Sequence, residues 1–203
     1  QHATIAMSNG FCLFNFAAAA AFHFQSTRSD LSQVKISILD WDVHMGQVVA
    51  DIVSKHPEII RYATIHQTPA FPYLGTKREI QNNILTIPII AETTWTCGYQ
   101  QCFNEALNFV FSEEWQLELV IVCAGYDGLD SDELASVSLH SSDYGRMTRA
   151  LLDRIRLQQQ SSSGSGKAAR LILGMEGGYQ LQEMAGGGNL QQAVLETIKA
   201  LLE

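Results

Sequence analysis

The sequence predicts an α/β protein with a mostly parallel β-sheet that is flanked by helices on both faces. Short apolar runs of β-type residues alternate along the chain with segments of helical periodicity. This alternation is typical of three-layer, Rossmann-like folds, because a helix crosses over the sheet between successive parallel strands. The 203 residues, 46% of them apolar, are enough to fill one core, so we expect a single domain over residues 1–203.

Five apolar runs are expected to form strands, at residues 34–39, 59–65, 84–90, 117–123 and 171–173. Apolar residues recur at helical spacing over residues 103–110, 144–155 and 190–201, and Ser141, Ser142 and Asp143 are cap candidates for the second of these helices. We interpret the alanine-rich segment 11–24 as a buried helix. Residues 67–83 are expected to be an irregular loop, and residues 158–167 (QQQSSSGSGK) a flexible polar loop.

The composition excludes some classes of partner. A net charge of −8 without a basic stripe argues against direct nucleic-acid binding. No apolar run reaches the ~20 residues of a membrane span, so no membrane association is expected. No Cys-x-x-Cys zinc pair occurs, and we expect reduced core thiols in an intracellular protein, at Cys12, Cys97, Cys102 and Cys123.

Polar side chains follow three of the expected strands. The first strand runs into DWDVH, the fourth into AGYD and the fifth into GMEGGY. In an open parallel sheet the ligand site lies beyond the carboxyl ends of the strands, so these acids, an imidazole and a phenol should meet at one edge. Asp42 and His44 are two residues apart in an extended segment and project to the same side. With Asp127 they would form a three-ligand site with an open position, as a catalytic zinc requires.

Each of these residues also has a simpler interpretation. Aspartates after strands are frequently turn or helix-capping residues, and a lone tyrosine such as Tyr179 more often packs than reacts. Apart from any family resemblance, the sequence gives the least support for a functional role of His2, because a histidine near a chain end is usually solvated. The occurrence of Asp42, His44 and Asp127 together on this fold pattern favours the metal site.

At these residues the sequence resembles the histone deacetylase family, in particular its class II branch. DWDVHMG at residues 40–46 is similar to the D-W-D-V-H-H-G motif, residues 123–127 to S-A-G-F-D, and residues 176–179 to the end of L-E-G-G-Y. Gln1-His2-Ala3 with Gly10-Phe11-Cys12 resembles the His-His-Ala … Gly-Phe-Cys segment, and Phe71-Pro72 resembles the Phe-Pro of the tunnel loop. The match is collinear over nearly the whole chain. It implies an arginase/deacetylase-like fold, of which residues 1–203 would be the C-terminal two-thirds of the catalytic domain.

The resemblance implies a zinc-dependent deacetylase that hydrolyses N-acetyl-lysine in proteins such as histones. The metal ligands would be Asp42, His44 and Asp127; the general base would be His2 and the oxyanion donor Tyr179. Behind these residues Asp40 would orient Gln1, and the substrate tunnel would be lined by Gly10, Phe11, Phe71 and Leu134. A structural potassium ion would be surrounded by Asp40, Asp42, His44, Thr64 and Ile65. Corepressor-type protein partners and a nuclear or cytoplasmic location are also implied.

The chain departs from the family pattern around the base. Gln1 replaces the first histidine of the tandem pair, Met45 the second histidine of the metal motif, and Gln47 an Asp or Asn that would orient His2. Residues 77–81 (KREIQ) replace a glycine-rich stretch. Two alternatives follow: a deacetylase of acetylpolyamines or other small acylamines, and a pseudoenzyme that binds acyl-lysine without turnover. A ureohydrolase of the arginase type is disfavoured, because Met45, Gly46 and Gln47 follow the D-x-H segment in place of further aspartates.

Overall fold

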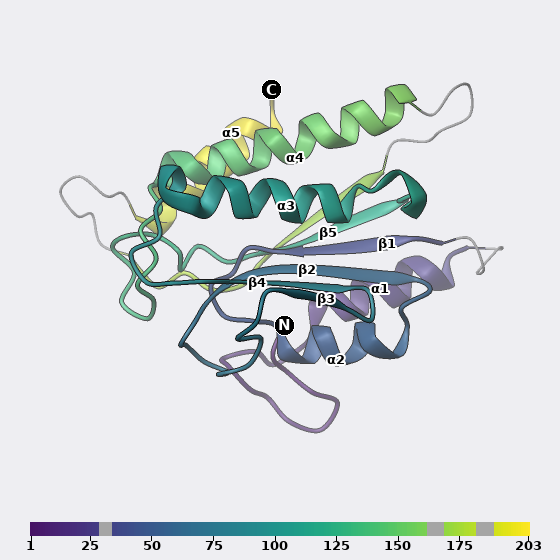
Figure 1. The fold of residues 1–203 in the computed structure, drawn as a ribbon, viewed down its shortest axis with the longest axis horizontal. Helices are drawn as coiled ribbons and strands as arrows, with labels where there is room; N and C mark the ends of the chain where they lie inside the picture. The colour runs from purple at the N-terminus through teal and green to yellow at the C-terminus, as the bar shows by residue number, and fades with distance from the viewer. Residues whose placement is uncertain (29–33, 162–168, 182–188) are drawn as a thin grey trace.

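The computed structural model describes residues 1–28, 34–161, 169–181 and 189–203, and its centre is a six-stranded sheet (Figure 1). The strand order is β3-β4-β2-β1-β5-β6, and every neighbouring pair is parallel except β3 with β4. The strands are β1 (Ile36–Asp40), β2 (Ile60–Gln67), β3 (Glu79–Gln81), β4 (Ile84–Ile89), β5 (Leu119–Ala124) and β6 (Arg170–Met175). The predicted α/β class with a mostly parallel sheet is confirmed.

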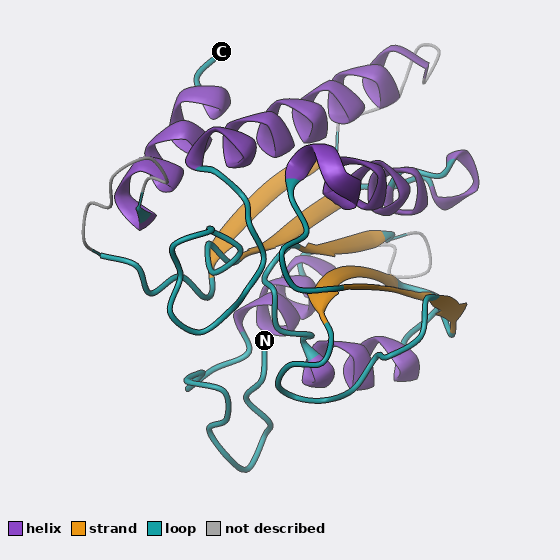
Figure 2. Ribbon diagram, turned by 60° about the vertical axis from the view of Figure 1, so that its left-hand side comes forward, coloured by secondary structure: helices purple, strands orange, loops and turns teal. Residues whose placement is uncertain are grey.

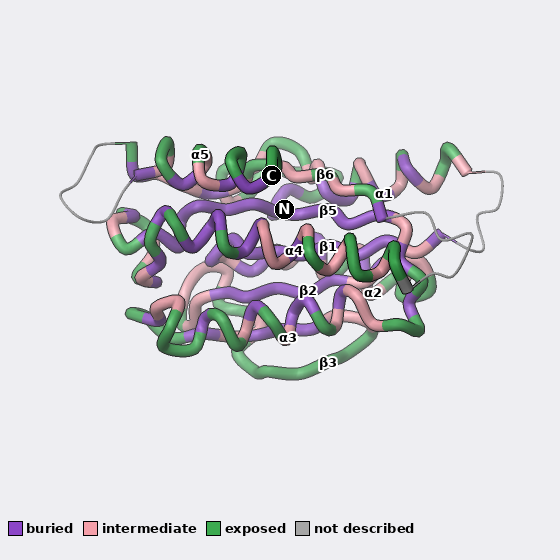
Figure 3. The backbone as a smooth tube through the Cα atoms, turned by 90° about the horizontal axis from the view of Figure 1, so that it is seen from above, coloured by how far each residue is buried: buried purple, intermediate pink, exposed green. Residues whose placement is uncertain are grey.

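Helices cover both faces of the sheet (Figures 1 and 2). One face carries α1 (Phe16–Ser26) and α2 (Gln47–Lys55); the other carries α3 (Gln100–Val110), α4 (Ser141–Ser161) and α5 (Leu190–Leu201). Two short helical segments, η2 (Trp95–Tyr99) and η3 (Glu113–Trp115), flank α3. Alternate residues of the central strands enter two separate cores: Val120 packs toward α3 and Ile121 toward α1. The central strands are therefore buried on both sides (Figure 3).

The expected helix at 11–24 is wrong at its start, because α1 begins at Phe16. The Asn15 side chain accepts a hydrogen bond from the Ala18 N–H and caps the helix there. Phe11 consequently lies in the preceding loop, where its side chain is 84% exposed. The expected core thiols also need a correction, since Cys123 is buried but Cys97 is exposed.

Both expected loops contain regular structure. Within residues 67–83, Gln67 belongs to β2, and β3 pairs antiparallel with β4 through a turn at Asn82 and Asn83, both at positive φ. The polar loop at 158–167 is wrong for its first four residues, because α4 continues to Ser161 and the Gln158 side chain donates to the Leu117 carbonyl. Residues 162–167 lie outside the described residues. No helix in the described part of the chain is both long and apolar enough to cross a membrane.

Candidate metal centre and adjoining cavity

The segments that follow β1, β5 and β6 lie side by side because these three strands are neighbours in the sheet. Backbone hydrogen bonds continue past the last two strands: Glu176 N–H donates to the Ala124 carbonyl, and Tyr126 N–H donates to the Gly177 carbonyl at 2.7 Å. Asp42, Asp127 and Tyr179 are thus delivered to one edge of the sheet by strand register. This is the edge at which parallel α/β sheets bind ligands.

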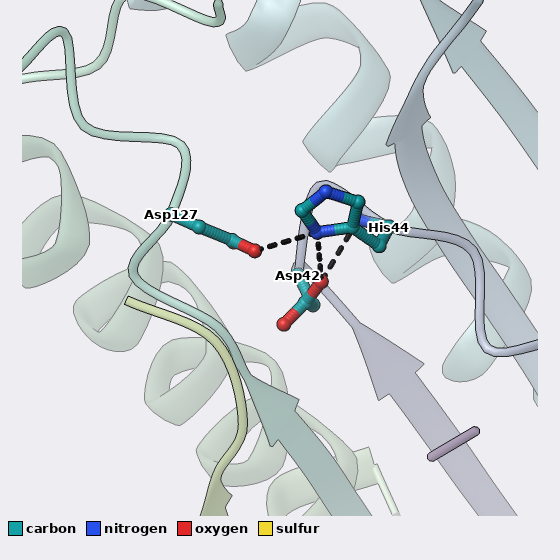
Figure 4. A group of neighbouring side chains, drawn as sticks. All are labelled: Asp42, His44 and Asp127. Atoms are coloured by element: carbon teal, nitrogen blue, oxygen red, sulfur yellow. Dashed lines mark hydrogen bonds and ion pairs between the residues drawn. The ribbon is translucent and has the colours of Figure 1, made fainter. Parts of the chain in front are cut away.

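Asp42, His44 and Asp127 could together hold a metal ion, because one ligand atom of each residue lies within 4.8 Å of the others (Figure 4); we call these three residues the metal-binding group. His44 Nδ1 is 2.8 Å from Asp127 Oδ2 and 3.3 Å from Asp42 Oδ1. Each carboxylate is also held by backbone: Asp42 Oδ1 accepts from the His44 N–H, and Asp127 Oδ1 accepts from the Val43 N–H. Side chains from two segments that are more than 80 residues apart in the sequence therefore converge on one point.

Two glycines make room for the two carboxylates. A Cβ at Gly177 would lie 2.3 Å from Asp127 Oδ2, and one at Gly125 would lie 2.4 Å from Asp42 Oδ2. The Gly177 N–H also donates to Asp42 Oδ2 at 2.8 Å. Any larger residue at either position would displace a carboxylate, so the backbone is shaped around the metal-binding group.

The electrostatics of the metal-binding group require a positive charge. Burial and the neighbouring Asp42 charge raise the pKa of Asp127 to about 7. Burial lowers the pKa of His44, but the hydrogen bonds to Asp127 and Asp42 outweigh it and raise that pKa to about 10. His44 thus supplies the balancing charge as an imidazolium. Two buried carboxylates and one imidazole also match the donor set of a zinc site, so the residues present fit a divalent cation that would take over this role.

Asp40 lies behind the metal-binding group at the end of β1. Its carboxylate accepts from the Tyr62 hydroxyl at 2.6 Å and from the Asp42 N–H at 3.1 Å. Burial, together with the Asp42 charge, raises the pKa of Asp40 well above its usual range. Asp40 pairs in register with Thr64, which precedes Ile65 on β2. Binding of potassium by this region stays a prediction.

The Gln1 side chain is not oriented by Asp40, as the family resemblance had implied. Its side-chain amide donates to the His44 carbonyl at 3.1 Å and lies 3.3 Å from His2 Nε2, whereas Asp40 is occupied by Tyr62. Gln1 therefore contacts the candidate base directly, and Asp40 supports the Asp42 backbone.

A cavity of about 660 Å³ opens next to the metal-binding group. It is lined by two of the metal-binding residues and by every residue expected at the base, donor and tunnel positions: His2, Gly10, Phe11, Phe71, Leu134 and Tyr179. Its remaining lining comes mostly from the loop before α1 and from the end of β6, and of these residues only Gln1 was expected at the site: Gln1, Cys12, Leu13, Phe14, Phe16, Met175, Glu176 and Gly177. The apolar residues at 13–16 resemble a helix pattern in the sequence, so no local signal marks them as cavity residues.

His2 is buried in the cavity wall despite its weak case in the sequence. Its Nδ1 lies 2.6 Å from the Gln47 side-chain oxygen. Because an amide oxygen can only accept, Nδ1 carries the proton and Nε2 is left as the basic nitrogen. Burial lowers the pKa of His2, although the Gln47 hydrogen bond opposes this effect. The imidazole is therefore neutral near neutral pH.

Tyr179 and the aromatic residues lie around the same space. The Phe11 ring packs edge-on against Tyr179 at 5.9 Å between centroids, and the Phe71 ring packs edge-on against His2 at 5.2 Å. Leu134 is half-exposed at the mouth of the cavity. Burial, followed by the charges of Asp127 and Asp42, raises the pKa of the Tyr179 phenol, which keeps its proton available for donation.

Residues 1–195 match the family described as the histone deacetylase domain. The chain belongs to the histone deacetylase family. An uncharacterized protein from Synechocystis sp. is 34% identical, with 100% of this chain and 59% of that protein aligned. Acetylpolyamine amidohydrolase 2 from Pseudomonas aeruginosa is 29% identical over 91% of this chain and 50% of that protein.

The fold of this histone deacetylase family member is also similar to that of solved relatives. The HDA15 HD domain superposes with a TM-score of 0.75 and 25% sequence identity. The superposition covers 99% of this chain and 54% of the HDA15 chain. The 203 residues thus span between half and three-fifths of these three relatives. Membership in this family, with an amidohydrolase among the relatives, supports a hydrolase.

Proposed function

We propose that this histone deacetylase family member is a zinc-dependent deacetylase that hydrolyses the amide of N-acetyl-lysine in proteins such as histones. The observation that carries the proposal is the metal-binding group beside the His2 imidazole and the Tyr179 phenol in one cavity. Asp42, His44 and Asp127 would hold the ion. A bound zinc would supply a Lewis acid that polarises the amide carbonyl and lowers the pKa of a water molecule.

His2 is the proposed general base. Gln47 fixes its tautomer, so that Nε2 carries the lone pair, with the Gln1 amide 3.3 Å away. Nε2 accepts the proton of the attacking water and afterwards passes it to the nitrogen of the departing lysine amine. The products are acetate and the free amine.

Tyr179 is the proposed oxyanion donor. Its raised pKa keeps the phenol protonated, and its hydroxyl donates to the carbonyl oxygen as negative charge develops there. Such a donor acts most strongly in the transition state, where one is worth about 3 to 4 kcal/mol. Phe11 and Phe71 would enclose the apolar stem of the lysine, whose acylated head is neutral and cheaper to bury than an ammonium.

The test is hydrolysis of a fluorogenic acetyl-lysine peptide by the zinc-loaded chain. Turnover should disappear with a strong chelator and return when zinc is added. A folded, zinc-loaded protein that hydrolyses no acylated amine would overturn the proposal and favour a binding module that retains the cavity without turnover.

The second candidate is an acetylpolyamine deacetylase, favoured by the Pseudomonas aeruginosa relative and by the net charge of −8, which suits a cationic substrate. The two candidates use the same residues and differ in substrate only. Comparing kcat/KM for an acetyl-lysine peptide and for N-acetylputrescine separates them. For either substrate we propose an intracellular setting without membrane or nucleic-acid binding, and corepressor-type partners in the protein-substrate case.

A further inference from the structure

One buried carboxylate joins two parts of the cavity that are far apart in the sequence. Asp132 lies in the turn after β5 with its side chain 8% exposed. Its Oδ1 accepts from the Leu134 N–H at 2.9 Å, and its Oδ2 accepts from the Tyr179 N–H at 2.8 Å. Leu134 is at the cavity mouth, and Tyr179 supplies the phenol. The same side chain thus contacts the backbone of both.

The two hydrogen bonds differ in kind. The bond to Leu134 spans two residues and is an ordinary Asx turn, which aspartates form without any functional reason. The bond to Tyr179 spans 47 residues and connects the turn to the segment after β6. Turn formation does not require this second bond.

The segment that carries Tyr179 needs such a support. Gly177 is fixed by its N–H donation to Asp42 and by its carbonyl, which accepts from Tyr126. Gly178 follows at a φ of +134°, a conformation that residues with a side chain rarely adopt. The hydrogen bond from the Tyr179 N–H to Asp132 comes directly after this glycine, and the Gln180 carbonyl beyond it accepts from the Leu190 N–H. A charged acceptor at this point makes a stronger hydrogen bond than a neutral one.

We propose that Asp132 is a positioning residue that holds the Tyr179 phenol at the reacting carbonyl and sets its distance from Leu134 at the mouth. This inference rests on the proposed function, because it assumes that Tyr179 donates to the substrate. Asp132 itself touches neither substrate nor metal in this scheme.

Asp132→Asn separates the two hydrogen bonds. The amide oxygen can keep the Asx turn to Leu134, while the amide nitrogen would face the Tyr179 N–H and cannot accept from it. We expect kcat to fall roughly 10- to 100-fold with a smaller change in KM, since a misplacement of about 1 Å can cost a factor of about 100. Zinc content and the thermal midpoint should stay near those of the unaltered chain. Glu133→Ala, an exposed neighbour in the same turn, is the control and should leave both constants unchanged.

A double-mutant cycle with Tyr179→Phe decides whether Asp132 acts through the phenol. If it does, adding Asp132→Asn to Tyr179→Phe should lower kcat no further, because the group being positioned is already gone. An equal fold-loss in both backgrounds would overturn the proposal.

Hydrogen exchange of the metal-free and zinc-loaded chains gives a readout that needs no turnover. Asp132→Asn should speed exchange in peptides that cover residues 176–181 and leave the β1 peptides unchanged. Unchanged exchange at 176–181 would contradict the inference. If the unaltered chain proves inactive on every acylated amine, the proposed function fails, while this exchange result still decides whether Asp132 holds the segment.

Discussion

The floor and the mouth of the cavity are built in different ways. At the floor, Asp42 and Asp127 are almost fully buried, follow directly from adjacent strands and are packed against glycine backbone. At the mouth, Phe11 and Leu134 are 84% and 50% exposed and belong to loops. Strand register therefore positions the metal-binding group, whereas a few individual side chains position the loops at the mouth.

The loop that carries Phe71 illustrates this dependence. His66, at the end of β2, is buried under the loop, and its Nε2 lies 2.9 Å from the Gly75 carbonyl. Since a carbonyl only accepts, Nε2 must carry a proton. Gly75 has a φ of +65°, and a Cβ there would meet Met45 and His66. We call residues 68–78 the Phe71 wall. The turn at Gly75, which packs against Met45 and His66, thus determines the position of this loop.

The largest expected effect tests the floor. Asp127→Ala removes one of three ligands and the acceptor of the Val43 N–H, so zinc should no longer be retained and turnover should fall below detection. Zinc content after dialysis and peptide hydrolysis measure both. The exposed Asp51→Ala on α2 carries the same charge change and should affect neither. Hydrolysis that survived in Asp127→Ala would rule out the metal mechanism.

Tyr179→Phe tests whether zinc binding at the floor can be separated from turnover. The phenol is not among the metal-binding residues, so zinc content should be unchanged while kcat falls roughly 100- to 1,000-fold. Loss of zinc in this variant would show that Tyr179 belongs to the floor and that the assignment of roles is wrong.

The difference between floor and mouth also explains what the sequence could predict. Five of the six strands were predictable from apolar runs, and Asp42, His44 and Asp127 from their place after those strands, because both features are local. α2 was missed: its valines and isoleucine are typical of strands, and burial of Val49 and Val53 stabilises it as a helix. β3 was missed because three exposed residues at a sheet edge carry no apolar alternation.

His66 and Asp132 were missed for a different reason. Each acts through a hydrogen bond to a backbone group of another segment, which spacing along the chain does not reveal. The asparagine pair at 82–83 was an available signal for the hairpin between β3 and β4. For a buried histidine that holds a carbonyl, the sequence carries no comparable signal.

A smaller effect is expected when the Phe71 wall is released. His66→Leu removes the donor to Gly75 and should raise KM several-fold for acetyl-lysine peptide, with zinc content unchanged and faster hydrogen exchange over residues 68–78. His66→Gln places an amide N–H near the position of Nε2 and should recover most of the loss. If hydrogen exchange over residues 68–78 stays as slow in both variants as in the unaltered chain, the His66 hydrogen bond does not hold Phe71. The strand ends would then position Phe71, as they position Asp42 and Asp127.

The smallest expected effect concerns the pH dependence of the base. Burial lowers the pKa of His2, so the neutral base is present at neutral pH and activity should decline only as the pH falls below about 6.5, the ordinary histidine value. Gln47→Glu places a carboxylate at the 2.6 Å contact, favours the imidazolium and should move this acid limb upward by about one pH unit. Lys55→Gln, exposed on the same helix, makes the same change in net charge and should leave the limb in place. The profile of kcat/KM against pH measures the shift. If the acid limb lies at the same pH in the unaltered chain, Gln47→Glu and Lys55→Gln, another group takes the proton and the Gln47 contact serves only packing.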